Sequence, residues 1–267
     1  MVISPTVRSD GTLTLPFKLD AGVGARGSIG LIVLASDQTI EHEFRRWLDI
    51  DGVAVHQSRI ANDNHITPDT LKAMEGRIAE ATALILPGAP LEVVAYGCTS
   101  ASMLIGEERV FDRIRSVRPH VACTTPITAA FSAFRTFEAK RIALLTPYRA
   151  DVNDAICAYI ETRDIEVPAI GSFHEEDDRR VCQISEASIF DAAMILGQSR
   201  NIDAIFVSCT ALRTAGVIAG IESALGKPVT SSNHALAWHC LRLAGVEDRR
   251  CDAGRLFQLD LCCDDRH

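Results

Sequence analysis

Short apolar runs recur along the chain, separated by longer stretches in which apolar residues return every three or four positions. The short runs are rich in Val, Ile, Leu and Ala, and polar or turn-forming residues bound them. Runs of this kind predict buried strands. The predicted strands are Ser28–Leu34, Val53–Val55, Leu91–Ala95, Val121–Thr124, Arg141–Leu145, Glu166–Ile170, Ile202–Val207 and Pro228–Asn233.

The intervening stretches predict helices. Thr67 followed by Pro68 is typical of a helix start, and Gly245 of a helix end. Strands that alternate with helices predict an α/β fold of parallel sheets flanked by helices, with ligand sites at the carboxyl ends of the strands. The predicted helices are Glu41–Leu48, Pro68–Ala83, Ser102–Ser116, Pro126–Phe137, Asp151–Thr162, Ser185–Ser199 and a last helix through Trp238 to Ala244.

Two cysteines stand in nearly the same local sequence about a hundred residues apart. Cys98 lies in Ala95–Ser100 (AYGCTS) and Cys209 in Phe206–Ala211 (FVSCTA), each after a predicted strand and before residues that can cap a helix. Helix N-termini offer N–H donors and the positive end of a dipole, which favour thiolate and can bind a substrate carboxylate. We therefore expect a duplicated site with paired acid/base or nucleophilic thiols. The other cysteines are expected to pack as small hydrophobes.

Composition narrows the choice of partners. The chain has 267 residues, 47% of them apolar, and a formal charge of −8. This length permits one large or two small domains. The apolar content excludes general disorder, and the acidic balance argues against nucleic acid or an acidic membrane as partner. The charged run Glu175–Arg180 is expected to be a solvated face or loop.

Location and metal content follow from what the sequence lacks. No apolar run reaches the roughly 18 to 20 residues that span a bilayer, and residues 1–20 lack the pattern of a secretion signal. We therefore expect a cytoplasmic protein with reduced thiols. The nine cysteines include no CxxC pair and do not match known ligand sets, so no metal is expected.

A series of motifs in a fixed order carries a family resemblance. The motifs are Ser36–Thr39, Gly97–Ser102, Thr146–Tyr148 with Asn153, Ser208–Thr214 and Gly226–Asn233 with Trp238. Over Gly27–Gly245 they resemble the maleate cis-trans isomerase family, which is grouped with arylmalonate decarboxylase and the aspartate/glutamate racemases. Within that superfamily, Asp37–Glu43 is most similar to the ectoine utilization protein EutA.

The resemblance implies two similar α/β domains of the Asp/Glu racemase type, with the active site in the cleft between them. It implies one cysteine from each domain and no cofactor. The expected division is an N-terminal arm at 1–26, a first domain at 27–125 completed by 216–250, a second domain at 126–215 and a tail at 251–267. Several Gly and Pro residues in the first segment also favour an arm.

By the same resemblance Cys98 and Cys209 are the catalytic positions. Two alternatives stay open: Tyr148 could only pack, and Asn153 could cap its helix. The residues implied to bind substrate are Asp37, Thr99, Ser100, Tyr148, Asn153, Thr210 and Asn233.

Asp37 departs from the family pattern, because maleate isomerases carry Asn at this place. Two unit charges about 4 Å apart at an effective dielectric constant near 20 repel by about 4 kcal/mol, which disfavours a dicarboxylate beside an ionised Asp37. An ammonium or amide-bearing substrate would suit it better. The alternative is that Asp37 caps the following helix and faces away from the ligand.

We expect a cofactor-independent isomerase or racemase that uses Cys98 and Cys209 on a small amino or carboxylic acid from ectoine or hydroxyectoine breakdown. Maleate isomerisation by thiolate addition is an alternative. An arylmalonate-type decarboxylase would need a single cysteine, so the pair argues against it. A non-catalytic metabolite-binding protein with the same cleft is a further alternative. The sequence leaves a homo-oligomer open.

Overall fold

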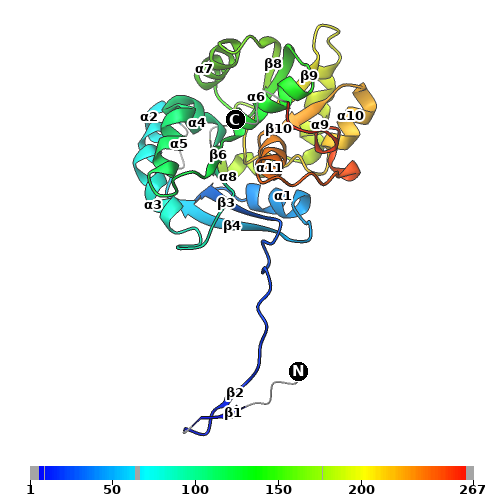
Figure 1. The fold of residues 1–267 in the computed structure, drawn as a ribbon. Helices are drawn as coiled ribbons and strands as arrows, with labels where there is room; N and C mark the ends of the chain where they lie inside the picture. Colours follow the sequence, from blue (N-terminus) through cyan, green and yellow to red (C-terminus); the bar gives the residue numbers. More distant parts are fainter. Residues whose placement is uncertain (1–5, 9, 64–66, 176, 263–267) are drawn as a thin grey trace.

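Within the described residues, which are 6–8, 10–63, 67–175 and 177–262, the computed structural model contains two four-stranded parallel sheets (Figure 1). The first sheet has the spatial order β4 (Val53–Ile60), β3 (Gly27–Leu34), β5 (Val93–Gly97) and β6 (Ala122–Thr124). The second has the order β8 (Glu166–Ser172), β7 (Arg141–Thr146), β9 (Ala204–Val207) and β10 (Val229–Ser231).

The two sheets have the same topology. In each half the first strand lies between the second and the third, and the fourth lies beyond the third. The strand order therefore reverses between β3 and β5 and again between β7 and β9, which is where open α/β sheets form ligand crevices. This repetition confirms the predicted pair of similar parallel α/β units.

Helices connect the strands of both halves. Those of the first half are α1 (Ile40–Trp47), α2 (Pro68–Lys72), α3 (Ile78–Ala83), α4 (Thr99–Ile105), α5 (Glu107–Arg115) and α6 (Pro126–Thr136), with the 3-10 helix η1 (Ala73–Arg77). Those of the second half are α7 (Ala150–Glu161), α8 (Asp178–Val181), α9 (Glu186–Gly197), α10 (Ile218–Leu225) and α11 (Ser232–Leu243), followed by η2 (Cys251–Ala253) and η3 (Leu256–Gln258).

Two helices predicted as continuous are divided. The stretch 68–83 forms α2, η1 and α3, and Gly76, a poor helix former, lies in η1. The stretch 102–116 is split between α4 and α5 at Gly106, whose φ of +97° is readily adopted only by glycine. The strand predicted at Val53–Val55 extends to Ile60, because it pairs along the whole length of β3.

The last helix of each half packs on the other half. Phe134 of α6 contacts Phe206 of β9 with ring centroids 5.5 Å apart, and α6 also contacts β10. In turn α11 contacts β5 and α1. The ring centroids of His234 in α11 and Trp47 in α1 are 5.1 Å apart. The segment 216–250, which the sequence assigned to the first domain, thus supplies a strand to the second sheet and a helix that packs on the first.

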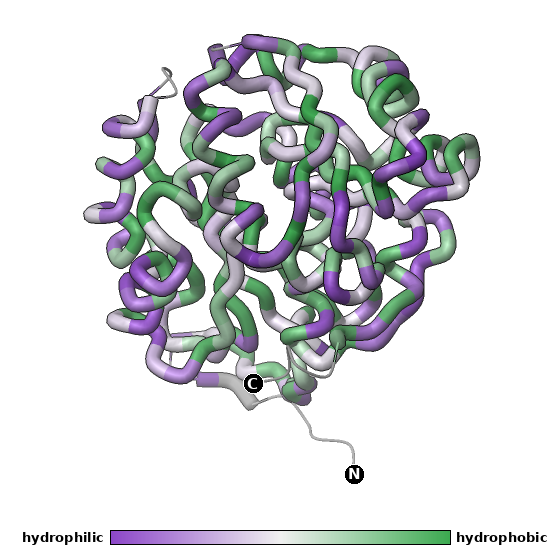
Figure 2. Tube along the Cα trace, turned by 90° about the horizontal axis from the view of Figure 1, so that it is seen from above, coloured by the Kyte–Doolittle hydropathy of each residue, from purple (hydrophilic) through white to green (hydrophobic). Residues whose placement is uncertain are grey.

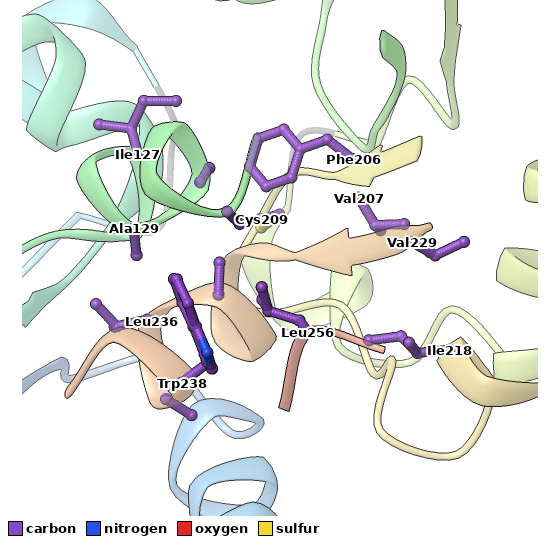
Figure 3. Close-up of a cluster of buried hydrophobic side chains, with 14 of the residues drawn as sticks. Ile127, Ala129, Phe206, Val207, Cys209, Ile218, Val229, Leu236, Trp238 and Leu256 are labelled. Carbon is purple, nitrogen blue, oxygen red and sulfur yellow. The ribbon is translucent and has the colours of Figure 1, made fainter. Parts of the chain in front are cut away.

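Two hydrophobic clusters form the interior. Apolar segments run through the centre of the molecule, whereas the outer helical turns carry many polar residues (Figure 2). The larger cluster includes Cys209 together with Phe206 and Ile127 (Figure 3). The smaller cluster belongs to the first half and includes Cys98. Each of the two site cysteines is therefore at the edge of an apolar core.

The N-terminal residues extend away from the sheets (Figure 1). There β1 (Thr6–Val7) pairs antiparallel with β2 (Leu13–Thr14), and the Phe17 and Leu19 side chains after the hairpin are 79% and 88% exposed. No helix in the described part of the chain combines the length and the apolar character needed to cross a membrane.

Candidate active site

Cys98 and Cys209 occupy equivalent positions in the two halves. Cys98 directly follows β5 and caps α4, and Cys209 follows β9 after Ser208. Both therefore stand where the strand order reverses. Gly97 permits the close packing before Cys98, because a Cβ there would lie 2.9 Å from the carbonyl oxygen of Ile32.

One pocket brings the two thiols together. Its walls come from both halves of the chain, and both cysteine side chains are buried. Six of the nine predicted residues line it, and Asp37, Asn153 and Asn233 do not. The six are Cys98, Thr99, Ser100, Tyr148, Cys209 and Thr210. The other lining residues are Leu34, Asn62, Asp63, Thr70, Leu71, Met74 and Asp178.

Each sulfur receives polar contacts from its own segment. The Cys98 sulfur interacts with the backbone N–H of Ala101, and its Sγ lies 3.9 Å from the Ser100 hydroxyl. The Cys209 sulfur interacts with the hydroxyl of Tyr148 and the backbone N–H of Ala211. These donors favour the ionised form of each thiol.

Burial nevertheless dominates the ionisation of both thiols. Desolvation raises the pKa of Cys98 to about 12, and it raises the pKa of Cys209 still further. The negative charges of Asp178 and Asp37 add to this effect at both sulfurs. The sequence predicted that helix N-termini would favour thiolate, and the donors do act in that direction. Without ligand, however, both thiols are neutral at pH 7.

Ser232 links the two cysteine segments. Its Oγ accepts hydrogen bonds from the Thr99 hydroxyl at 2.7 Å and from the Cys209 backbone N–H at 3.0 Å. The Thr99 hydroxyl, predicted to help bind a carboxylate, is thus engaged within the protein. Cys209 itself has a φ of +154°, an unusual value for a non-glycine residue. Ser232 was not predicted, although it lies in a polar segment directly after a predicted strand.

Asn153 lies behind Tyr148 rather than in the pocket wall. Its Nδ2 donates to the carbonyl oxygen of Tyr148 at 3.0 Å, and its Oδ1 accepts from the Thr146 hydroxyl at 2.6 Å. Ser172 donates a further hydrogen bond of 2.5 Å to the Tyr148 carbonyl. Asn153 therefore fixes the Tyr148 loop, and its predicted contact with substrate stays a prediction.

Asp37 caps α1, which is one of the two roles considered from the sequence, and its side chain is not among those that line the pocket. Its Oδ1 accepts from the N–H groups of Thr39 at 2.7 Å and Ile40 at 2.9 Å, which caps α1. Its Oδ2 is buried and accepts no hydrogen bond of ordinary length from the described residues, although Thr210 is near enough to favour the ionised form. Burial raises the pKa of Asp37 to about 6.

Asp178 corrects the prediction for the charged run Glu175–Arg180. Its carboxylate is buried, lines the pocket and accepts a hydrogen bond of 2.6 Å from the Ser36 hydroxyl. Desolvation raises its pKa. Its partner Ser36 lies in the loop after β3, far away in the sequence, so the local sequence shows no more than a polar run.

Glu43 fixes the segment after Cys209. This buried carboxylate accepts hydrogen bonds from the backbone N–H groups of Thr214 and, at 2.6 Å, Ala215. It also accepts from Asn233 Nδ2 at 2.8 Å, which in turn donates to the Thr210 carbonyl at 2.7 Å. Asn233, predicted to bind substrate, therefore faces Glu43 and is absent from the pocket wall.

A signal for Glu43 was present in the sequence. Ile40, Glu43, Phe44 and Trp47 recur at the spacing of one helix face, and all four are buried. An acidic residue inside such an apolar stripe must have partners, because an unpaired buried carboxylate is costly. The stripe could therefore have identified Glu43, but not the residues that it contacts.

The chain was compared with known protein families and structures. The family model described as arylmalonate decarboxylase matches residues 50–257. A maleate isomerase from Nocardia farcinica is 27% identical over 243 residues, which cover 87% of this chain and 96% of that protein. An arylmalonate decarboxylase from Bordetella bronchiseptica is 31% identical over 137 residues, or 51% of this chain and 57% of that protein.

A solved structure extends the similarity to the fold. It is a cysteine-to-serine variant of the Nocardia farcinica maleate cis-trans isomerase with a covalently bound succinylcysteine intermediate. Its identity to this chain is 25%, its TM-score is 0.80, and the match covers 87% of this chain and 98% of that one.

Proposed function

This chain belongs to the arylmalonate decarboxylase family, and on that premise we propose that it is a cofactor-independent isomerase acting on a small carboxylic or amino acid. In this proposal Cys98 and Cys209 are the paired acid and base. The observation that carries it is that two buried thiols from equivalent strand ends line a single pocket.

A two-base mechanism fits the contacts around the sulfurs. One cysteine, as thiolate, takes the proton from the α-carbon, and the other, as thiol, returns a proton to the opposite face. Negative charge develops on the substrate carboxylate in between. In this proposal the carboxylate is bound by the main-chain N–H groups of Thr99 and Ser100, which belong to residues of the pocket wall and have no carbonyl partner within the helix. Tyr148 donates to the Cys209 sulfur and stabilises it whenever it is ionised.

Thiolate addition is the second candidate. The covalently bound succinylcysteine in the Nocardia farcinica enzyme supports it. A thiolate would bond to one carbon of a double bond, the resulting single bond would rotate, and elimination would restore both the double bond and the thiolate. The same two cysteines serve this chemistry, but Asp37 and Asp178 oppose a doubly charged substrate.

Decarboxylation is weaker as a candidate, because delivery of one proton to one carbanion leaves the second cysteine without a role. A protein that only binds a metabolite in the same cleft is the non-catalytic alternative. We further propose a place in ectoine or hydroxyectoine degradation, which rests only on the resemblance of Asp37–Glu43 to EutA drawn from the sequence. Acetylated diaminobutyrates are the substrates that test this narrower proposal.

Proton NMR in deuterated water tests the proposed function. Reduced protein is incubated with aspartate, maleate or acetylated diaminobutyrates, and loss of the α-proton signal is followed together with product peaks. We expect exchange that requires both cysteines, so that Cys98→Ser and Cys209→Ser each abolish turnover. Cys123→Ser is the matched control, because Cys123 is also buried but does not line the pocket.

The outcomes separate the candidates. Exchange or racemisation lost in both site variants supports the two-base isomerase. Conversion of maleate without α-proton exchange supports thiolate addition. Full activity in either cysteine variant contradicts a paired mechanism, and saturable binding without turnover of any substrate supports a binding protein.

A further inference from the structure

The charged residues that line the pocket in the described part of the chain are all acidic. Asp178 and Asp63 line it, and none of its described lining residues is Lys, Arg or His. Asp37 lies close enough for Asp178 to raise its pKa, and both carboxylates act on the two sulfurs. Two buried carboxylates therefore share one site with no cation among the residues that line it.

Among the described residues, neither Asp37 nor Asp178 forms an ion pair with a positively charged side chain. Asp178 is bound to a neutral hydroxyl, that of Ser36. Asp37 Oδ2 is buried, and among the described residues only the Thr210 hydroxyl, a neutral group, is near enough to favour its charge. The guanidinium of Arg59 reaches this segment, but it donates to the main-chain carbonyl of Asp37 at 3.0 Å and pairs with Glu41. A buried carboxylate without a cationic partner is costly. The arrangement therefore favours a ligand that supplies a positively charged donor.

We propose that Asp37 and Asp178 form a subsite for a cationic group, so that the pocket selects an ammonium-bearing acid over a dicarboxylate. The proposal rests on the proposed function, because it places this group beside the two reacting thiols. A bound ammonium would donate to Asp178, which lines the pocket, and would also be attracted by the buried charge of Asp37, which lies near Asp178 but does not itself line the pocket.

The cation would also change the reactivity of the thiols. Without ligand, burial and two negative charges keep both thiols protonated. An ammonium group near the two carboxylates cancels part of that negative field and lowers the pKa of each thiol. The ammonium group of the substrate would thereby help to ionise the thiols that react with that substrate. Without substrate the thiols would stay protonated and unreactive.

Three acids with a four-carbon backbone test the subsite. Maleate carries two negative charges at neutral pH, aspartate one net negative charge and 2,4-diaminobutyrate one net positive charge. Affinities for the full-length, reduced protein are measured by isothermal titration calorimetry. We expect 2,4-diaminobutyrate to bind most tightly and maleate most weakly.

Two conservative variants remove one charge each. Asp178→Asn keeps an oxygen for Ser36, and Asp37→Asn keeps an oxygen for the cap of α1. Each should lower the preference for 2,4-diaminobutyrate over maleate by about tenfold or more. Asp177→Asn is the matched control, because Asp177 is the neighbouring acid but pairs with Arg179 and does not line the pocket. It should leave the preference within about twofold, as expected for a surface ion pair.

The binding and turnover experiments distinguish failure of the cationic subsite from failure of the proposed isomerase. Tighter binding of maleate by the wild type, or an unchanged preference in both folded Asn variants, overturns the cationic subsite. Near-UV circular dichroism establishes folding, and the wild-type preference tests the subsite without any variant. Preferential binding of 2,4-diaminobutyrate without proton exchange of any substrate supports the subsite and contradicts the isomerase. Maleate isomerisation with tight maleate binding supports the isomerase and overturns the subsite.

Discussion

Glu43 offers a sharp test of how the structure holds its active-site segments. The residue belongs to the first half of the chain, yet it accepts hydrogen bonds from Thr214, Ala215 and Asn233 of the second. Burial raises the pKa of Glu43 from 4.5 to about 7, against the opposing effect of these donors. Replacement by Gln removes the titrating group while it keeps the shape and one acceptor oxygen.

The sign of the pH effect follows from the raised pKa. Between about pH 4.5 and pH 7 the unfolded chain has lost the Glu43 proton, whereas the folded protein still retains it. The free energy of unfolding therefore falls as the pH rises through this window, by about 3 kcal/mol for this group. Glu43→Gln lacks that decline. Its amide also leaves one buried donor without an acceptor, at a cost of about 1–3 kcal/mol.

Urea unfolding at pH 5, 6, 7 and 8 measures both effects. We expect Glu43→Gln to be less stable than the wild type at pH 5 by the cost of that donor. The deficit should shrink by about 3 kcal/mol at pH 8, where the wild type carries the buried charge. Glu80→Gln, at an exposed position, is the control and should follow the wild type at every pH. Parallel pH curves for the wild type and Glu43→Gln would refute the reasoning.

Three further substitutions have clear expected results. Tyr148→Phe removes the hydroxyl donor to Cys209, so the pH midpoint of turnover should rise and the rate at pH 7 fall about tenfold, as steady-state kinetics would show. Ser232→Ala leaves the buried Cys209 N–H and Thr99 hydroxyl without their acceptor, so urea unfolding should show a loss of about 1–3 kcal/mol. Gly106→Ala forces alanine to a φ of +97°, and should lower the unfolding free energy by about 1–3 kcal/mol in the same assay.

The fold was predictable because its determinants are local and repeated. Strands such as β3 and β7 are nearly continuous apolar runs between clear helix signals, and the second half repeats the pattern of the first. Helix continuity was overestimated, because the apolar spacing persists although the helix narrows to 3-10 geometry around Gly76 and is interrupted at Gly106. Which sheet receives the strand and the helix of 216–250 depends on contacts between the halves, which periodicity does not reveal.

The site was predictable where a residue carries its own chemistry. Cys98, Cys209 and Tyr148 lie in one pocket, as the motifs implied. Asp178 and Ser232 were missed because their importance comes from long-range partners, Ser36 in one case and Thr99 in the other. The direction of the thiol pKa shift was also missed, because a sequence shows the helix start but not how completely a sulfur is removed from water.

Helices α6 and α11 each pack on the opposite half of the chain, which decides how the protein can be divided into fragments. Each half carries a complete sheet topology, yet it covers that sheet with a helix encoded in the other half. A fragment that ends after β6 would expose the apolar surface of β5 that α11 covers, and a fragment that begins at β7 would leave Phe206 without Phe134. The two halves therefore depend on each other to cover their apolar surfaces, and we expect neither fragment to fold alone.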